Sequence, residues 1–381
     1  MPDDLPVPLG ASAAAAVAEA IGGHAADWDR AGAVPIPVLR GLGAAGILSA
    51  QVPASYGGLG LSSAHNGELT AHTGALCGSV RSVMTSQGMA AWAIRRLGGP
   101  EQWKAHLPSL TGGALAAVAF SEPEAGSDLG AMRTAITVDG DSVVVDGAKV
   151  WVTAAAYADL IVVFGACGDG AAAAVVPTDT PGVRVRRVAH PMGCRAAGHA
   201  DVTFDRVRLP ADHLLGGSGR SLPLLVTSAL SYGRLSIAWG CAGILRACLA
   251  AASAHAASRR QFGKRLGDHQ LVARHLAELV VAERSATRAC EHASRCWDHS
   301  SPDLVIAAVL AKHTAAVQAA QGAAAAVQVL ASAGAGDGHV VARAYRDAKL
   351  MEIIEGSNEI CQLILAQHAL ETTTGMRAGA P

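Results

Sequence analysis

Three short segments combine residue types that could act on a flat polar molecule or on an acidic C–H bond. The first, AFSEPEAGSD at residues 119–128, predicts a hydroxyl-rich turn in which Gly126 would let a ligand approach the backbone. The second, KVWVT at residues 149–153, places Trp151 and Thr153 on one face of a β-strand, which suits stacking against a heterocycle. Each segment alone is equally compatible with an ordinary turn or a core tryptophan.

The third segment, YRDAKLMEIIEGSNE at residues 345–359, holds a carboxylate among apolar neighbours. Glu355 follows two isoleucines and precedes Gly356. Burial disfavours the charged form of a carboxylate, so we expect the pKa of Glu355 to be raised. Such a carboxylate can act as a general base toward a carbon acid, and the alternative is a helix-terminal glutamate in solvent. Gly356 would permit a sharp turn, and Ser357 could cap the next helix.

Three stretches with different sequence patterns must position these segments. Residues 11–112 are helical in pattern, with helices expected at 13–28, 37–48, 62–77 and 79–97. Residues 114–216 are β-rich, with a hairpin around Asp139-Gly140 and further runs at 160–164, 172–176, 183–188 and 201–209. Long helices return at 224–258, 269–297 and 302–330, followed by shorter ones at 340–354 and 357–370 and a loose tail at 372–381.

This order of elements predicts an α+β protein with three domains. We expect an N-terminal helical domain at residues 1–113 and a middle antiparallel sheet or small barrel at residues 114–216. A C-terminal helical bundle would occupy residues 217–381.

The composition excludes several functional classes. The 381 residues include 30 Lys and Arg against 31 Asp and Glu, and this near-neutral balance disfavours a nucleic-acid binder. A 51% hydrophobic share excludes a disordered chain, and no uninterrupted apolar run suits a membrane span. Eight cysteines without a CxxC pair, and a start at residues 1–10 unlike a signal peptide, favour the cytoplasm. The histidines form no metal motif, so no metal is expected.

Together with SRRQFG at residues 258–263, the three segments resemble, in this order, the acyl-CoA dehydrogenase family. The resemblance extends over nearly the whole chain. It implies an N-terminal helical domain, a middle antiparallel β-barrel domain and a C-terminal four-helix bundle. It also implies an FAD cofactor, an acyl thioester substrate, an electron acceptor of unspecified identity, and assembly as a homodimer or homotetramer.

The resemblance assigns the chemistry to Glu355. This residue matches the family's usual catalytic base, and Arg234 would support the base or the substrate. A minority of the family carries its base at the position of Gly233, so Glu355 is the matching candidate. Glu355 would remove the proton α to the thioester carbonyl while the β-hydrogen leaves as hydride to flavin N5.

The same resemblance implies a set of cofactor contacts. The first two segments would hold the flavin ring, SRRQFG would reach the FAD of another subunit, and the end of the third long helix would lie near the adenosine. The implied residues are Phe120, Ser121, Ser127, Trp151, Thr153, Arg259, Phe262, Gln328, Ser332, Ser357 and Glu359. Ser332 replaces part of the family's glycine pair, and Glu359 stands where Gln is often found.

Three further stretches indicate the substrate class. RSVMTSQGMA at 81–90, GCRAAGHAD at 193–201 and SYGRLSIAW at 231–239 resemble a subgroup that acts on carrier-bound short acyl units. That subgroup supplies methoxymalonyl or hydroxymalonyl extender units for polyketide antibiotics, which implies a small polar thioester on an acyl carrier protein or CoA. Gln87, Tyr232 and Gly356 are the candidate substrate contacts. The alternatives are a general short- or branched-chain acyl-CoA dehydrogenase and a flavin monooxygenase or oxidase of this fold.

Overall fold

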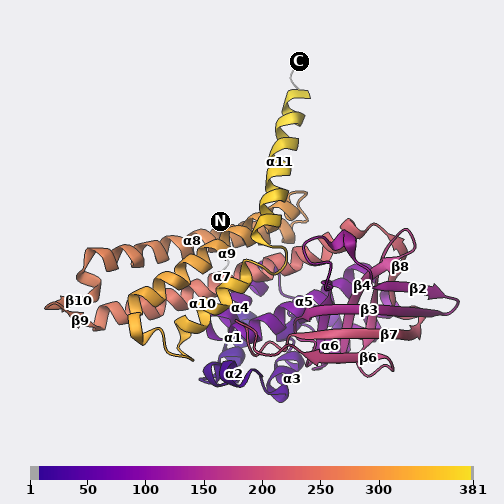
Figure 1. Cartoon of the computed structure of the whole chain (residues 1–381), viewed down its shortest axis with the longest axis horizontal. Helices are drawn as coiled ribbons and strands as arrows, with labels where there is room; N and C mark the ends of the chain where they lie inside the picture. The colour runs from indigo at the N-terminus through magenta and orange to yellow at the C-terminus, as the bar shows by residue number, and fades with distance from the viewer. Residues whose placement is uncertain (1–7, 379–381) are drawn as a thin grey trace.

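The computed structural model describes residues 8–378, which form N-terminal helices, a β-sheet and a long C-terminal helical bundle (Figure 1). The N-terminal helices are α1 (Pro8–Ile21), α2 (Ala25–Ala31), α3 (Ile36–Ala44), α4 (Ser63–Leu76), α5 (Gly78–Leu97) and α6 (Pro100–Thr111). The expected single helix at 13–28 is wrong. Gly22 adopts a left-handed backbone conformation (φ 47°) just after α1, and such a residue commonly ends a helix.

The middle of the chain forms an eight-stranded sheet, which confirms the expected β-rich layer between two helical parts. Its strands are β1 (Ala116–Ala119), β2 (Ala135–Asp139), β3 (Ser142–Val152), β4 (Leu160–Cys167), β5 (Gly170–Pro177), β6 (Val183–Arg187), β7 (Ala200–Pro210) and β8 (Leu214–Arg220). The order is β6-β7-β3-β2-β4-β5-β8, with β1 paired to β4. The pairs are antiparallel except β1–β4 and a single β2–β4 position. The predicted hairpin is confirmed, because Asp139 pairs with Ser142.

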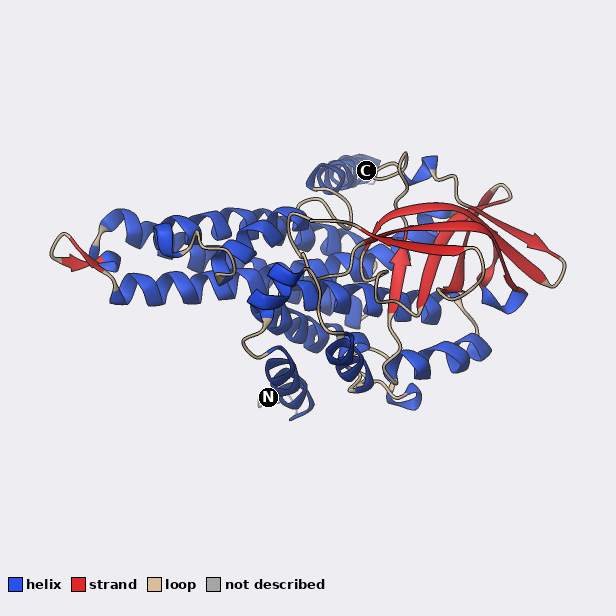
Figure 2. Ribbon diagram, turned by 60° about the horizontal axis from the view of Figure 1, so that its bottom comes forward, coloured by secondary structure: helices blue, strands red, loops and turns tan. Residues whose placement is uncertain are grey.

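Strand β4 is buried on both faces, which explains its uninterrupted apolar sequence. Ile161 and Val163 pack with Phe204 of β7 in one hydrophobic cluster. Val162 and Phe164 belong to a second cluster that includes side chains of α5 and α6. A strand covered on both sides cannot show the alternation of a half-exposed strand. The curved strands therefore enclose one apolar layer and rest on helices through another (Figure 2).

The C-terminal part is a bundle of long helices. It contains α7 (Leu222–Ser258), α8 (Gln270–Asp298), α9 (Leu304–Leu330), α10 (Val340–Met351) and α11 (Asn358–Ala378), with a short hairpin of β9 (Arg260–Gln261) and β10 (Lys264–Arg265). Helix α7 packs against α9, α8 and α4 around a core made largely of alanine. Residues 224–258 and 304–333 are long and apolar enough to cross a membrane, and 72% and 44% of their apolar windows are buried within the fold.

The predicted loose tail at 372–381 is wrong for its described part. Helix α11 continues without interruption to Ala378 and projects from the body of the molecule (Figure 1). Residues 379–381 lie outside the described part of the chain.

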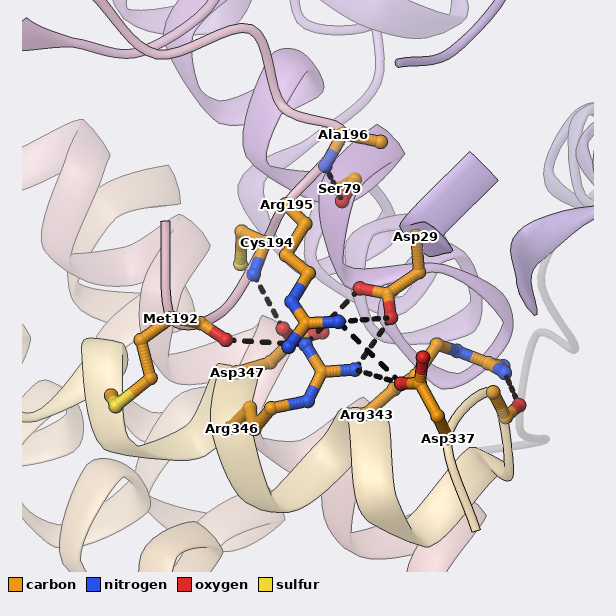
Figure 3. A network of polar contacts seen from close by, with 11 residues as sticks. Asp29, Ser79, Met192, Cys194, Arg195, Ala196, Asp337, Arg343, Arg346 and Asp347 are labelled. Carbon is orange, nitrogen blue, oxygen red and sulfur yellow. Dashed lines mark hydrogen bonds and ion pairs between the residues drawn. The ribbon is translucent and has the colours of Figure 1, made fainter. Parts of the chain in front are cut away.

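An ionic network joins the N-terminal helices to the bundle (Figure 3). The carboxylate of Asp29, on α2, pairs with Arg346 of α10 and, at 3.8 Å, with Arg195 of the loop before β7. Asp347 accepts a hydrogen bond from the backbone N–H of Cys194 in the same loop. The side chains of Asp29 and Arg346 are 5% and 16% exposed, so this ion pair is largely removed from water. Three separate parts of the chain are thereby fixed relative to one another.

We expect Asp29→Asn to lower the free energy of unfolding by about 3 kcal/mol, because the largely buried Arg346 charge then has only Asp337, at 3.9 Å, as an ion-pair partner. The measurement is urea-induced unfolding followed by circular dichroism. Asp205→Asn is the control, since the pair of Asp205 with Arg184 is exposed and should contribute no more than about 1 kcal/mol. Equal losses in the two variants would contradict a stabilising role for the network.

Candidate active site

A cavity of about 520 Å³ lies where α5, the sheet and the turn after α10 meet. It brings together the three segments that the sequence pattern singled out, although they are far apart along the chain. The predicted site residues in its wall are Phe120, Ser121, Ser127, Trp151, Thr153, Glu355, Gly356 and Ser357.

The turn that carries Glu355 has an unusual backbone. Glu355 (φ 57°) and Gly356 (φ 90°) are both in the left-handed region, which costs a non-glycine residue energy and persists only when its surroundings enforce it. Arg234 Nε donates to the Glu355 carbonyl oxygen at 3.2 Å. Lys312 Nζ donates to the Gly356 carbonyl oxygen at 2.7 Å. Ser357 Oγ accepts from the Ile360 N–H at 3.4 Å, in the capping position predicted for it.

One oxygen of the Glu355 carboxyl group, Oε2, is shielded from solvent. This oxygen has no hydrogen-bond partner among residues 8–378. A Cβ on Gly233 would lie 2.3 Å from this oxygen, so the missing side chain on α7 makes room for the carboxyl group. Burial raises the pKa of Glu355 to about 7, although nearby arginine and lysine charges act to lower it. The predicted rise is confirmed, and the group can accept a proton near neutral pH.

Trp151 and Thr153 reach the cavity by a different route from the one expected. The pairing of β3 with β7 shifts register between Lys149 and Val152, and Trp151 itself has a φ of 55°. Simple alternation along a strand therefore does not explain their shared position. A β-bulge turns the chain so that the indole of Trp151 remains 53% exposed in the cavity wall.

A buried ion pair, not predicted from the sequence, ties the first two segments together. Lys149 Nζ lies 2.8 Å from Glu122 Oε1 and donates to the Phe120 carbonyl oxygen at 2.8 Å. Glu122 also accepts from the backbone N–H groups of Arg133 and Thr134. Burial acts to raise the pKa of Glu122, but these hydrogen bonds outweigh it and lower the pKa to about 2. The wall next to Ser121 is thus held by an ionised, fully bonded carboxylate.

Neither Gln87 nor Tyr232 lines this cavity, and their contact with the substrate stays a prediction. The Gln87 amide donates to the Ala114 carbonyl oxygen at 2.9 Å and accepts from the Ala116 N–H at 2.6 Å, which anchors α5 to β1. The hydroxyl of Tyr232 accepts from Asn66 Nδ2 at 3.3 Å inside the helical core. The polar groups of both residues therefore form hydrogen bonds that join secondary-structure elements of the fold.

The remaining predicted cofactor contacts lie outside this cavity. Arg259 and Phe262 belong to the β9–β10 hairpin region at the outer end of the bundle, and Phe262 is 93% exposed (Figure 1). Gln328 and Ser332 are exposed at the C-terminal end of α9, and Glu359 is exposed in the first turn of α11. Their cofactor contacts stay predictions, and those of Arg259 and Phe262 would involve a second copy of the chain.

Two buried basic side chains in the cavity wall were not predicted. Arg81 is 1% exposed and His199 is 8% exposed, and both line the cavity. Burial lowers the pKa of His199 to about 4, with further lowering by the charges of Arg81 and Arg187, so its imidazole is neutral at neutral pH. Each lies in a stretch that the sequence had linked to the substrate class, 81–90 and 193–201, but nothing in either stretch showed that the two side chains share a cavity.

Comparison with known proteins identifies family models that match successive parts of the chain and a relative that matches most of it. Models of the acyl-CoA dehydrogenase N-terminal, middle and C-terminal domains match residues 9–114, 117–207 and 224–370. The probable acyl-CoA dehydrogenase YngJ of Bacillus subtilis (strain 168) is 33% identical over 356 residues, which cover 91% of this chain and 93% of YngJ.

Two solved structures extend the comparison. FkbI, described for biosynthesis of the methoxymalonyl extender unit of the Fk520 polyketide immunosuppressant, is 62% identical, with a TM-score of 0.90 over 94% of this chain and 99% of that chain. A glutaryl-CoA dehydrogenase from Mycobacterium smegmatis in complex with FADH2 is 26% identical, with a TM-score of 0.89 over 96% of this chain and 95% of that chain.

The raised pKa of Glu355 predicts a pH-dependent stability. Between about pH 4.5 and 7 the folded state binds more protons than the unfolded chain, so stability falls as pH rises through this window. Glu355→Gln cannot ionise at this position. We therefore expect its free energy of unfolding, relative to that of the wild type, to rise by up to about 3 kcal/mol from about pH 4 to pH 8.

Urea unfolding at several pH values measures this difference. Glu124→Gln, which changes an exposed carboxylate, is the matched control. Its free energy of unfolding should differ from that of the wild type by a nearly constant amount at all pH values. A Glu355→Gln offset that does not change with pH would contradict the raised pKa.

Proposed function

This chain belongs to the acyl-CoA dehydrogenase family, and from that premise we propose that it oxidises a short acyl thioester with Glu355 as the base. The observation that carries the proposal is the unpartnered Glu355 carboxyl group in the wall of a cavity, with a pKa of about 7. A base is most effective when its pKa lies near the working pH, and this carboxylate meets that condition.

FAD is the cofactor of this family, and the cavity wall fits a flavin. The exposed indole of Trp151 offers a flat surface for stacking, and Ser121, Ser127 and Thr153 offer hydroxyl groups for a polar ring edge. We propose that these residues and Phe120 hold the ring. When bound, the flavin supplies a two-electron acceptor for the substrate's hydride.

The chain's own residues would perform the proton transfer. Glu355 accepts the proton α to the thioester carbonyl at a carboxylate oxygen. Arg234 and Lys312 bind backbone carbonyl groups of the same turn, so they orient the base while leaving its carboxyl oxygens unbonded. The Glu355 N–H is the donor that we propose for the substrate carbonyl oxygen, on which negative charge develops as the proton leaves.

Two observations support a short acyl group from polyketide extender-unit supply. FkbI, which shares 62% of its residues with this chain, is named for methoxymalonyl extender-unit biosynthesis. The cavity of about 520 Å³ must hold part of the cofactor as well as the acyl group, which leaves little room for a long chain. We propose an acyl carrier protein or CoA thioester as substrate, a homodimer or homotetramer as the active form, and action in the cytoplasm.

Glu355→Gln should keep FAD bound but abolish bleaching of the flavin by substrate, because the amide cannot accept the α-proton. Anaerobic stopped-flow absorbance measures bleaching, and the bound flavin spectrum reports FAD content. Glu278→Gln, an exposed change on α8, is the control and should bleach at the wild-type rate. Undiminished bleaching in Glu355→Gln would reject Glu355 as the base.

The substrate is tested with matched thioesters on CoA and on an acyl carrier protein, each carrying either a glyceryl group or a short alkyl group. We expect the carrier-bound glyceryl thioester to bleach the flavin fastest and to give an oxidised product by mass spectrometry. Turnover of alkyl-CoA alone would favour a general acyl-CoA dehydrogenase. Fast oxygen consumption by the reduced protein would favour a monooxygenase or oxidase of this fold.

A further inference from the structure

His199 is a buried histidine next to the two side chains at the end of β3 that are proposed to hold the flavin ring. It lies just before β7, is 8% exposed and lines the cavity together with Trp151 and Thr153. Its Nδ1 lies 3.3 Å from the Thr153 hydroxyl oxygen. Its ring centre lies 5.9 Å from that of Trp151, with the two planes tilted by 55°, which is within the range of aromatic pairs. One imidazole therefore adjoins both flavin-facing side chains.

The backbone around His199 is fixed against the segment that carries Thr153. The His199 carbonyl oxygen accepts a hydrogen bond from the Val188 N–H at 2.9 Å. Two residues earlier, the Ala197 carbonyl oxygen accepts from the N–H of Ala154, the residue after Thr153, at 3.1 Å. These main-chain hydrogen bonds keep the backbone of His199 next to that of Thr153.

The hydroxyl group of Thr153 depends on His199 for its orientation. The Thr153 carbonyl oxygen accepts from the Ser86 hydroxyl of α5 at 3.0 Å, which fixes the main chain but not the side-chain O–H. Within residues 8–378, the imidazole is the one hydrogen-bond partner of the Thr153 hydroxyl. A hydroxyl hydrogen rotates to suit its partners, so His199 decides where this one points before a ligand binds.

The imidazole of His199 is neutral, and this determines what it offers to Thr153. Burial, together with the charges of Arg81 and Arg187, lowers its pKa to about 4. A neutral imidazole has one N–H donor and one acceptor nitrogen. Nε2 has no partner within the described chain, and a buried N–H without a partner is rarer than a buried acceptor without one. We therefore place the proton on Nδ1, where it donates to the Thr153 oxygen and leaves the Thr153 O–H to donate elsewhere.

We propose that His199 is a positioning residue for the flavin, which acts by turning the O–H of Thr153 toward the polar edge of the ring. The inference rests on the proposed function, because that function places the ring against Trp151 and Thr153. Reduction of a flavin adds electron density at its polar edge, so a donor there stabilises the reduced form more than the oxidised form. Through Thr153, His199 thereby raises the midpoint potential of the bound FAD.

The test measures the midpoint potential of protein-bound FAD by anaerobic reduction beside a reference dye, a measurement that needs no substrate. His199→Phe keeps a flat ring but cannot donate to Thr153. We expect it to lower the preference for reduced over oxidised flavin about tenfold, the size of one hydrogen bond, which is about 30 mV for a two-electron couple. His199→Asn, whose side-chain N–H can take the place of the Nδ1 donor, should recover most of the potential.

A double-mutant cycle shows whether His199 acts through Thr153. Thr153→Val removes the hydroxyl, and we expect it to lower the midpoint potential by a similar amount. In that background, His199→Phe should change the flavin preference by less than about twofold, because the group that it orients is gone. The matched control is His65→Phe, which breaks a 3.1 Å contact between an imidazole Nδ1 and the Ser62 hydroxyl at the exposed start of α4 and should leave the potential unchanged. Circular dichroism and the flavin spectrum verify folding and FAD content.

A wild-type potential in His199→Phe overturns the inference, as does a shift of equal size with and without the Thr153 hydroxyl. If His199→Phe does not fold or loses FAD, His199→Asn decides: a wild-type potential supports the inference, and a fully lowered one shows that the ring matters and the hydrogen bond does not. Thr153→Val separates the inference from the proposed function. An unchanged potential in Thr153→Val rejects the proposed place of the flavin, whereas a lowered potential there with an unchanged one in His199→Phe rejects the role of His199 alone.

Discussion

The site depends on keeping one carboxylate buried without giving it a partner. A neighbouring cation that bound the Glu355 carboxyl group directly would hold it ionised and occupy the oxygen that must receive a proton. Instead, Arg234 and Lys312 donate to main-chain oxygens of the turn. Their charges favour the ionised form from a distance, while burial favours the neutral form. The bare α-carbon of Gly233 leaves the space that this carboxyl group occupies.

The cavity belongs to no single part of the chain, so its precision depends on how the parts are joined. The Lys149–Glu122 pair connects the first turn to β3, and Gln87 connects α5 to β1. The ionic network at Asp29 links the first helices to α10, the helix that leads into the Glu355 turn. These connections are polar and largely buried, so they specify one geometry where apolar packing alone would tolerate several.

Much of the architecture could be predicted because its signals are local. The Asp139-Gly140 turn, the apolar run of β4 and the isoleucines before Glu355 each lie within a few residues of the feature that they predict. The side chains that complete the site gave no such signal. Glu122 and Lys149 are 27 residues apart, and the missing partner of Arg81 Nε is visible only when all its neighbours are known. Gln87 and Tyr232 do not line the cavity, and their polarity could not reveal which helix face a cavity adjoins.

The order of the site residues along the chain has a consequence for synthesis. Domains fold as units while the chain emerges from the ribosome, beginning at the N-terminus. The helices and strands that supply Arg81, Ser121 and Trp151 are complete long before the base and its supporting Lys312 are translated. A truncated or nascent chain can therefore carry most of the cavity wall while lacking the group that accepts the proton. The group that accepts the proton is added only after most of the cavity wall has been translated.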